Sequence, residues 1–201
     1  GVVPGNRVKA GQPLGRMGNT AGGYRIPWER AHLHFEIGLR LADDFQRWYD
    51  GRKFGSPNRH GPFNGMNLVG LDPIGFYRAY GEKRVKQPLD YLLSLPKIAV
   101  VRGRATRVPD FVRRYPNLSS YDGKAKAPSI WEITFGPAGI PLRCDPAPSG
   151  VKLPAGQRYQ VHSYQGPTDP CLKCRRLIIS KKGGLAPTTQ LTSYLDLLLG
   201  N

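Results

Sequence analysis

Two histidines separated by one residue, His32 and His34, have the spacing in this chain that most directly suggests chemistry. Side chains at positions i and i+2 of a strand project from the same face, so both imidazoles could reach one metal ion or one reacting group. Imidazole is a common zinc ligand and a frequent general acid or base. The pattern is short, however, and a polar strand face exposed to solvent is the alternative interpretation.

The segment that contains these histidines is HLHFEIGLRL, residues 32–41, in which apolar and polar residues alternate. The apolar positions, which would share one face of a strand, are Leu33, Phe35, Ile37, Leu39 and Leu41. The two histidines fall on the opposite face together with Glu36 and Arg40. The alternation predicts a strand with one core face and one face available for chemistry.

The run GNRVKAGQPLGRMGNTAGG followed by HLHFE resembles the lysostaphin/LytM family of zinc endopeptidases, which cut peptides of peptidoglycan. The matching residues, in the order of the family's pattern, are Val3, Gly5, Val8, Gly11, Gln12, Leu14, Gly15, Gly18, Asn19, Thr20 and His32 through Glu36. The resemblance covers roughly residues 1–40, and Leu71-Asp72-Pro73 is similar to the segment that closes such domains.

The resemblance implies zinc as the cofactor, with His34 as a ligand and His32 as a catalytic histidine beside the metal. Asn19, Thr20, Tyr24 and Trp28 would line the substrate groove, although ordinary loop aromatics are the alternative for the two rings. A zinc ion held by three protein ligands keeps a fourth position for water and lowers the pKa of that water.

The family takes its other two zinc ligands from an HxxxD motif, and a further catalytic histidine from a strand, all upstream of the first residue here. We therefore expect this chain to be the C-terminal part of a zinc peptidase that is active as the full-length parent and inactive as this chain alone. A catalytically inactive LytM-like activator of cell-wall hydrolases is the alternative within the same fold. Biotinyl and lipoyl carrier hairpins are also similar, but they need a lysine at the hairpin tip, which residues 15–19 lack.

The composition predicts a mainly β fold with many turns, because 25 Gly and 19 Pro accompany 39% hydrophobic residues. We expect residues 1–80 to form the C-terminal portion of a LytM-like antiparallel β-sheet with lipoyl-like hairpins, including a loop excursion over 42–66. Residues 85–201 would form a small accessory β-domain, with strands within 97–108, 129–136, 158–164 and 175–184. The tail LTSYLDLLLG predicts a short helix, capped by Thr192 or Ser193, that packs on this domain.

The formal net charge of +16 raises the possibility of a polyanionic partner, and +11 of it lies in residues 81–201. Solvated surface charge is the simpler interpretation, since the basic residues are scattered among Pro and Gly. The alternatives are attraction to an anionic envelope surface and, as a function of another class, nucleic-acid binding.

No apolar run approaches the roughly 18 residues of a membrane-spanning helix. A wall hydrolase acts outside the cytoplasm, so we expect a periplasmic or extracellular location, with any signal segment outside this chain.

Three cysteines are present, Cys144, Cys171 and Cys174. A single CxxC lacks the second pair of a structural zinc site. In an exported protein we expect a disulfide, either within CxxC or from Cys144 to one of its members.

Overall fold

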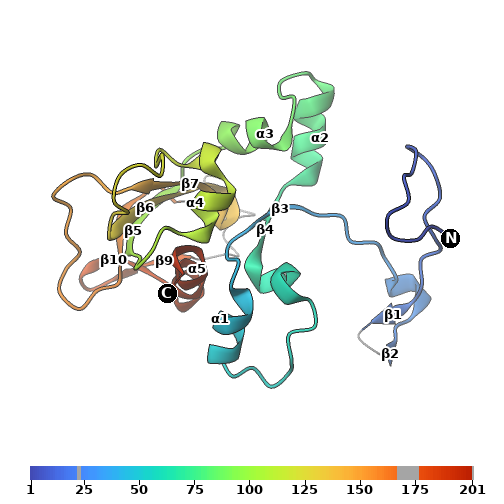
Figure 1. Cartoon of the computed structure of the whole chain (residues 1–201), viewed down its shortest axis with the longest axis horizontal. Coiled ribbons are helices and arrows are strands. Elements are labelled where there is room, and N and C mark those ends of the chain that lie inside the picture. Colours follow the sequence, from blue (N-terminus) through green and yellow to red (C-terminus); the bar gives the residue numbers. More distant parts are fainter. Residues whose placement is uncertain (22–23, 167–176, 201) are drawn as a thin grey trace. The chain divides into compact units, whose positions relative to one another are not determined.

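The computed structural model describes residues 1–21, 24–166 and 177–200 (Figure 1). By their internal contacts the residues form two compact units, Gly1–Glu36 and Ile37–Asn201, which are considered separately. The sequence predicts a division near residue 80, so the structural division comes more than forty residues earlier. Among the described residues, no helix is long and apolar enough to cross a membrane.

The first unit contains little regular structure. Strand β1, Thr20–Ala21, pairs antiparallel with β2, Tyr24–Arg25, and the 3-10 helix η1 follows at Trp28–Arg30. Turns occur at Gly5 and Gly11, whose positive φ angles of 92° and 79° suit glycine. Of the hairpins expected over the start of the chain, the described residues contain one with paired strands, between β1 and β2.

The second unit begins with β3, Ile37–Arg40, which pairs antiparallel with β4, Leu68–Leu71. The chain between them includes α1, Phe45–Gly51, and the 3-10 helices η2, Gly61–Phe63, and η3, Gly65–Asn67. The expected loop excursion over 42–66 is therefore partly helical. The fully buried side chain of Asn67 holds the two ends of this segment together. Asn67 Oδ1 accepts from Ala42 N–H at 2.9 Å, and Asn67 Nδ2 donates to Ala42 O and Pro62 O.

Two helices follow that the sequence analysis did not predict: α2, Pro73–Gly81, and α3, Pro88–Ser94. Each begins with a proline at its first position, which suits a helix start because the missing N–H has no partner there. Asp72 accepts from the backbone N–H of Ile74, and Gln87 forms a reciprocal capping box with Asp90. The chain is 29% helix and 23% strand, so the antiparallel sheets are confirmed but a mainly β fold is not.

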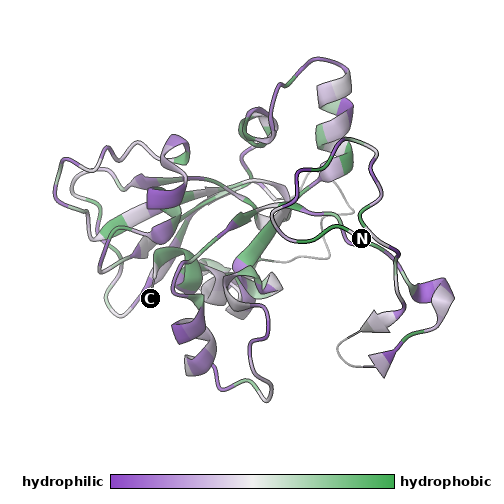
Figure 2. Cartoon of the chain, turned by 45° about the vertical axis from the view of Figure 1, so that its right-hand side comes forward, coloured by the Kyte–Doolittle hydropathy of each residue, from purple (hydrophilic) through white to green (hydrophobic). Residues whose placement is uncertain are grey.

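A four-stranded antiparallel sheet with the order β7-β6-β5-β8 forms the centre of the second unit. Its strands are β5, Ala99–Arg104; β6, Ile130–Phe135; β7, Pro141–Pro146; and β8, Tyr159–Tyr164. A separate hairpin pairs β9, Ile178–Lys181, with β10, Gly184–Pro187. The four strands predicted from residue 97 onward are thus confirmed as β5, β6, β8 and β9, and Figure 2 shows apolar stretches along the sheet.

Helix α5, Thr189–Leu199, packs on this sheet, as the apolar tail predicts. The helix begins earlier than expected, because Thr188 rather than Thr192 or Ser193 is the N-cap and accepts from Leu191 N–H. Gly103 of β5 allows the close approach, since a Cβ there would lie 2.5 Å from Leu199 Cδ1. A short helix, α4, Asp110–Arg114, and the 3-10 helices η4, Pro116–Leu118, and η5, Pro137–Gly139, complete the unit.

One hydrophobic core explains why the second unit begins at residue 37. Leu41, Phe45 and Val69 from the early part of this unit belong to the same buried cluster as Trp131 of β6 and Leu198 of α5. A domain boundary near residue 80 would separate these contacting side chains. The segment after β3 therefore folds as part of the sheet-containing unit.

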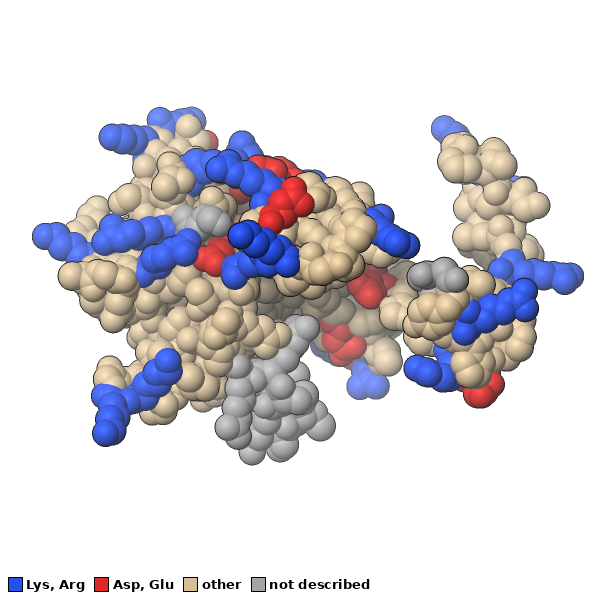
Figure 3. All heavy atoms as spheres, turned by 90° about the horizontal axis from the view of Figure 1, so that it is seen from below, with Lys and Arg blue, Asp and Glu red and all other residues tan. Residues whose placement is uncertain are grey.

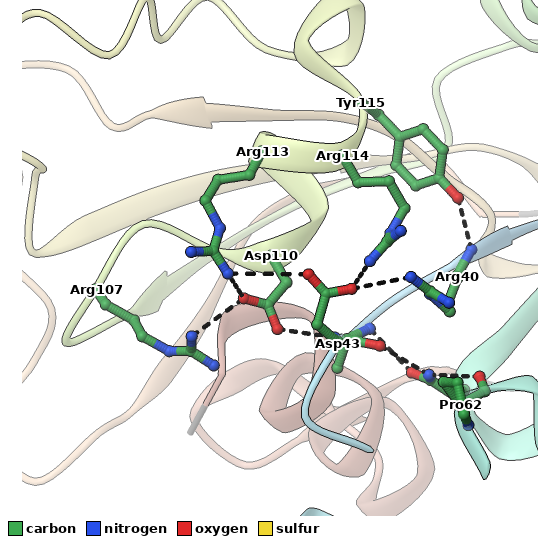
Figure 4. A network of polar contacts seen from close by, with 10 residues as sticks. Arg40, Asp43, Pro62, Arg107, Asp110, Arg113, Arg114 and Tyr115 are labelled. Atoms are coloured by element: carbon green, nitrogen blue, oxygen red, sulfur yellow. Dashed lines mark hydrogen bonds and ion pairs between the residues drawn. The ribbon is translucent and has the colours of Figure 1, made fainter.

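A buried carboxylate, Asp110, joins the segment after β3 to α4 (Figure 4). Its side chain is only 3% exposed and pairs with Arg113 and, at 3.1 Å, with Arg107. Its Oδ2 also accepts from the backbone N–H of Asp43 at 2.8 Å. Because a buried charge is stable only with charged or hydrogen-bonded partners, these groups depend on one another.

Asp43 is a second carboxylate of this network, and its side chain is more exposed than that of Asp110. Its carboxylate pairs with Arg114 and, at 3.1 Å, with Arg40, and lies 3.9 Å from Arg113. The backbone N–H of Arg40 donates to the Tyr115 hydroxyl at 2.9 Å. These contacts thus hold the end of β3 against α4 and against Tyr115, the residue that follows α4.

Replacing the buried acid tests this link. We expect Asp110→Asn to lower the free energy of unfolding by about 2–3 kcal/mol, because the amide leaves Arg107 and Arg113 without their shared negative partner. Urea denaturation measures the change. The matched control is Asp122→Asn at an exposed turn, which should change stability by less than about 0.5 kcal/mol. Equal losses in the two variants would contradict the role assigned to Asp110.

Candidate functional site

His32 and His34 converge, as their spacing predicts, although the backbone around them is not in a paired strand. Their Nε2 atoms lie 2.8 Å apart, and the ring centroids are 4.7 Å apart with the planes inclined at 27°. Both side chains are exposed. Two imidazole nitrogens at this distance share one hydrogen bond, so one ring donates and the other accepts.

The neighbouring groups decide which ring accepts. His32 Nδ1 lies 2.8 Å from the carbonyl oxygen of Arg30, which can only accept, so Nδ1 bears the proton. In a neutral ring the Nε2 atom of His32 then holds a lone pair and accepts from His34 Nε2–H. On the other side of His34, Nδ1 lies 3.6 Å from Glu36 Oε1. The groups therefore follow one another in the order Arg30 carbonyl, His32 ring, His34 ring and Glu36 carboxylate.

The strand expected over 32–41 is confirmed only in its second half, where β3 covers Ile37–Arg40. Leu41 is fully buried, and Ile37 and Leu39 pack against the core, as predicted. Leu33 and Phe35 are 84% and 58% exposed, so their predicted core positions are wrong. β4 ends at Leu71 opposite Ile37, so its ladder provides no partner for residues 32–36.

The residues expected to line a substrate groove lie in or next to the β1–β2 hairpin. Asn19 joins the two ends of the hairpin through two hydrogen bonds to Ile26. Its side-chain Nδ2 donates to Ile26 O at 2.9 Å, and its backbone carbonyl oxygen accepts from Ile26 N–H. Thr20 is in β1, Tyr24 is in β2, and Trp28 begins η1. The rings of Tyr24 and Trp28 are largely exposed and could contact a ligand.

The fit to zinc is incomplete within this chain. A catalytic zinc ion takes three protein ligands, whereas His32 and His34 supply at most two nitrogens. Within residues 1–21, 24–166 and 177–200, no group of three His, Cys, Asp or Glu side chains is placed to hold a metal ion. The described residues therefore supply part of a zinc site and not a complete one.

Cys144 of β7 is fully buried and forms no disulfide with any other residue that the structure describes. Burial raises the pKa of this thiol well above its ordinary value, and the neighbouring Asp145 carboxylate acts in the same direction. Cys171 and Cys174 lie outside the described residues, so the pairing expected for the cysteines stays a prediction.

The arginines of the second unit are scattered along the sequence, and the fold brings several of them together. Arg47 of α1 and Arg52, the residue after this helix, line one groove with Arg107 and Arg158, which come from distant parts of the chain. No local motif indicates this grouping, because it depends on long-range packing. Figure 3 shows one face of the molecule on which blue basic side chains are more numerous than red acidic ones.

Comparison with known proteins gives no relative: no family model, no curated protein and no solved structure matches this chain.

The buried thiol provides a test of the core. We expect Cys144 to react with iodoacetamide slowly in the folded protein at about pH 7 and at about pH 9, since burial keeps it protonated and inaccessible. In urea the same thiol should react faster as the pH approaches its ordinary pKa of about 8.5. Peptide mass spectrometry separates Cys144 from Cys171 and Cys174. Native-state labelling of Cys144 at the unfolded rate would contradict its placement in the sheet.

Proposed function

We propose that this chain contributes one zinc ligand, His34, and one catalytic histidine, His32, to a zinc metalloendopeptidase that hydrolyses peptide bonds in peptidoglycan. The main support is the hydrogen bond from His32 Nδ1–H to Arg30 O, which leaves Nε2 as the accepting nitrogen beside His34. Because two histidines do not complete a catalytic zinc site, the proposal assigns the other ligands to an HxxxD segment outside these 201 residues.

His34 would hold the metal through a ring nitrogen, and bound zinc would lower the pKa of a water molecule and polarise the scissile carbonyl. In such a site His32 Nε2 would be the group that accepts a proton from water and returns it to the leaving amine. The Arg30 carbonyl fixes the tautomer of His32 and stabilises the imidazolium formed between these two transfers.

The substrate and location follow from the same proposal. Tyr24 and Trp28 present exposed rings that would pack on a peptide, and the hairpin closed by Asn19 and Thr20 would position them. Peptidoglycan is outside the cytoplasm, which implies a periplasmic or extracellular protein. The basic second unit would favour contact with an anionic envelope surface.

A LytM-like activator of wall hydrolases is the second candidate. It is favoured by the direct Nε2–Nε2 contact, in which each imidazole satisfies the other without a metal, and by the incomplete ligand set among the described residues. The two candidates differ in whether the parent protein cuts peptidoglycan itself. If the chain raises the activity of a separate wall hydrolase in zinc-free buffer, the activator is supported and the peptidase is contradicted.

Two substitutions in the parent protein test the roles of the histidines. We expect His34→Ala to abolish zinc binding and turnover together, because it removes a ligand. We expect His32→Ala to retain zinc and to lower turnover by about 10²–10⁴-fold, the usual contribution of a general acid or base. Zinc content is measured by atomic absorption, and turnover by release of amino groups from purified peptidoglycan.

The matched control is His162→Ala, an exposed histidine of β8 in the second unit, which should change neither quantity. Equal loss of zinc in the His32 and His34 variants would contradict the assignment of roles. The 201-residue chain alone should release no peptide, and release by the chain alone would show that its two histidines suffice.

A further inference from the structure

A groove of about 590 Å³ lies in the second unit. Four segments form it: residues 42–52, which include α1, the loop after β5, the residue before β8 and the C-terminal end of α5. Four of its lining side chains are arginines: Arg47, Arg52, Arg107 and Arg158. The groove size falls within the range of about 300–1,000 Å³ typical of small-molecule sites.

Three of these arginines are oriented by contacts with the protein. Asp196 of α5, which is nearly buried, pairs with Arg52 at 2.8 Å and with Arg158 at 3.1 Å. The hydroxyl of Tyr159 donates to the same carboxylate at 2.5 Å. Arg52 also lies over the Trp48 ring, 4.7 Å from its centroid. Guanidinium groups held in this way lose little conformational freedom when they bind a ligand.

Arg107 is oriented by a different carboxylate, since its Nη1 lies 3.1 Å from Asp110 Oδ1. Asp110 also pairs with Arg113, so one negative charge serves two guanidinium groups. Each arginine has five N–H donors and these contacts use only some of them. The remaining donors of the oriented arginines are available to an additional acceptor.

All four arginines are exposed, and Arg47 differs from the other three because it forms no ion pair or side-chain hydrogen bond with any residue in the described ranges. It lies on α1 one turn before Gly51, which also lines the groove and has open space where a Cβ would project. The lining carboxylates are those of Asp44 and Asp196, so the four guanidinium groups leave an excess of two positive charges.

We infer that this groove binds a small molecule that carries a phosphate group. The planar guanidinium group binds phosphate oxygens through paired N–H donors, which makes arginine the preferred side chain for this recognition. The lining is concave and formed by converging segments, which suits a compact ligand better than the long backbone of a nucleic acid. The site does not depend on the histidine pair or on zinc.

Pyrophosphate is the probe for the test, with binding to the 201-residue chain measured by isothermal titration calorimetry at low salt. We expect Arg47→Gln to weaken binding at least about tenfold, because it removes one charge-assisted donor pair. Arg47→Lys keeps the charge but loses the paired geometry, so its affinity should lie between those of the original protein and Arg47→Gln. Neither variant breaks an ion pair or side-chain hydrogen bond with a residue that the structure describes, so both should keep the fold, which circular dichroism checks.

Arg78→Gln is the control, since Arg78 is an exposed arginine of α2 outside the groove and its loss removes the same charge. Its affinity for pyrophosphate should be unchanged within about twofold. Equal weakening by Arg78→Gln and Arg47→Gln would overturn the inference, because general charge attraction would then explain binding. Unchanged affinity for pyrophosphate in Arg47→Gln would also overturn the inference. The inference would likewise fail if a DNA duplex bound through Arg47 and pyrophosphate did not displace it.

Discussion

A shortage of carboxylates is the constraint on which the second unit depends. The chain has 30 Lys and Arg but only 14 Asp and Glu, so a buried acid in this unit neutralises more than one guanidinium group. Asp110 serves Arg107 and Arg113, and Asp196 serves Arg52 and Arg158. Both acids are enclosed by the fold, and each joins segments that are distant in sequence. Ionic contacts and the shared apolar core therefore act together to place the segment after β3 beside α4 and α5.

The same constraint produces the groove. When one carboxylate orients two arginines, the three groups together retain a net positive charge, and the arginines retain unused N–H donors. The excess charge is then concentrated where Asp110 and Asp196 gather arginines from separate segments. A net charge of +16 that looks scattered along the chain thus includes a localised cluster. The stability of the fold and the chemistry of the groove have the same physical origin.

The sequence predicted the parts of the fold that depend on local pattern. Alternation was sufficient for β5, β6 and β8, whose apolar side chains meet the core and whose backbones find partners. The same alternation failed at Leu33 and Phe35, because a strand also needs hydrogen-bonded neighbours, which a sequence pattern does not reveal. Helices α2 and α3 were missed although Asp72-Pro73 and the Gln87–Asp90 capping box are recognisable start signals. The arginine groove could not be predicted, since its members come from residues 47 to 158.

The sequence predicted that the two histidine rings converge, but it did not predict which ring nitrogens carry protons. The spacing of His32 and His34 indicated convergence, whereas the role of the Arg30 carbonyl depends on the backbone path. Its hydrogen bond gives the two rings different roles, with the accepting nitrogen on His32. The proposed catalytic function rests on that difference, because a general base needs an unprotonated nitrogen at the reacting position.

Nitrogen-15 NMR of the histidine side chains in this chain tests that central claim most directly. Long-range proton–nitrogen correlations distinguish a protonated Nδ1 from a protonated Nε2 in each ring. The account predicts that neutral His32 has its proton on Nδ1 and that its Nε2 has the shift of an acceptor. A proton on Nε2 of His32 would place the lone pair at the Arg30 carbonyl and would contradict the account.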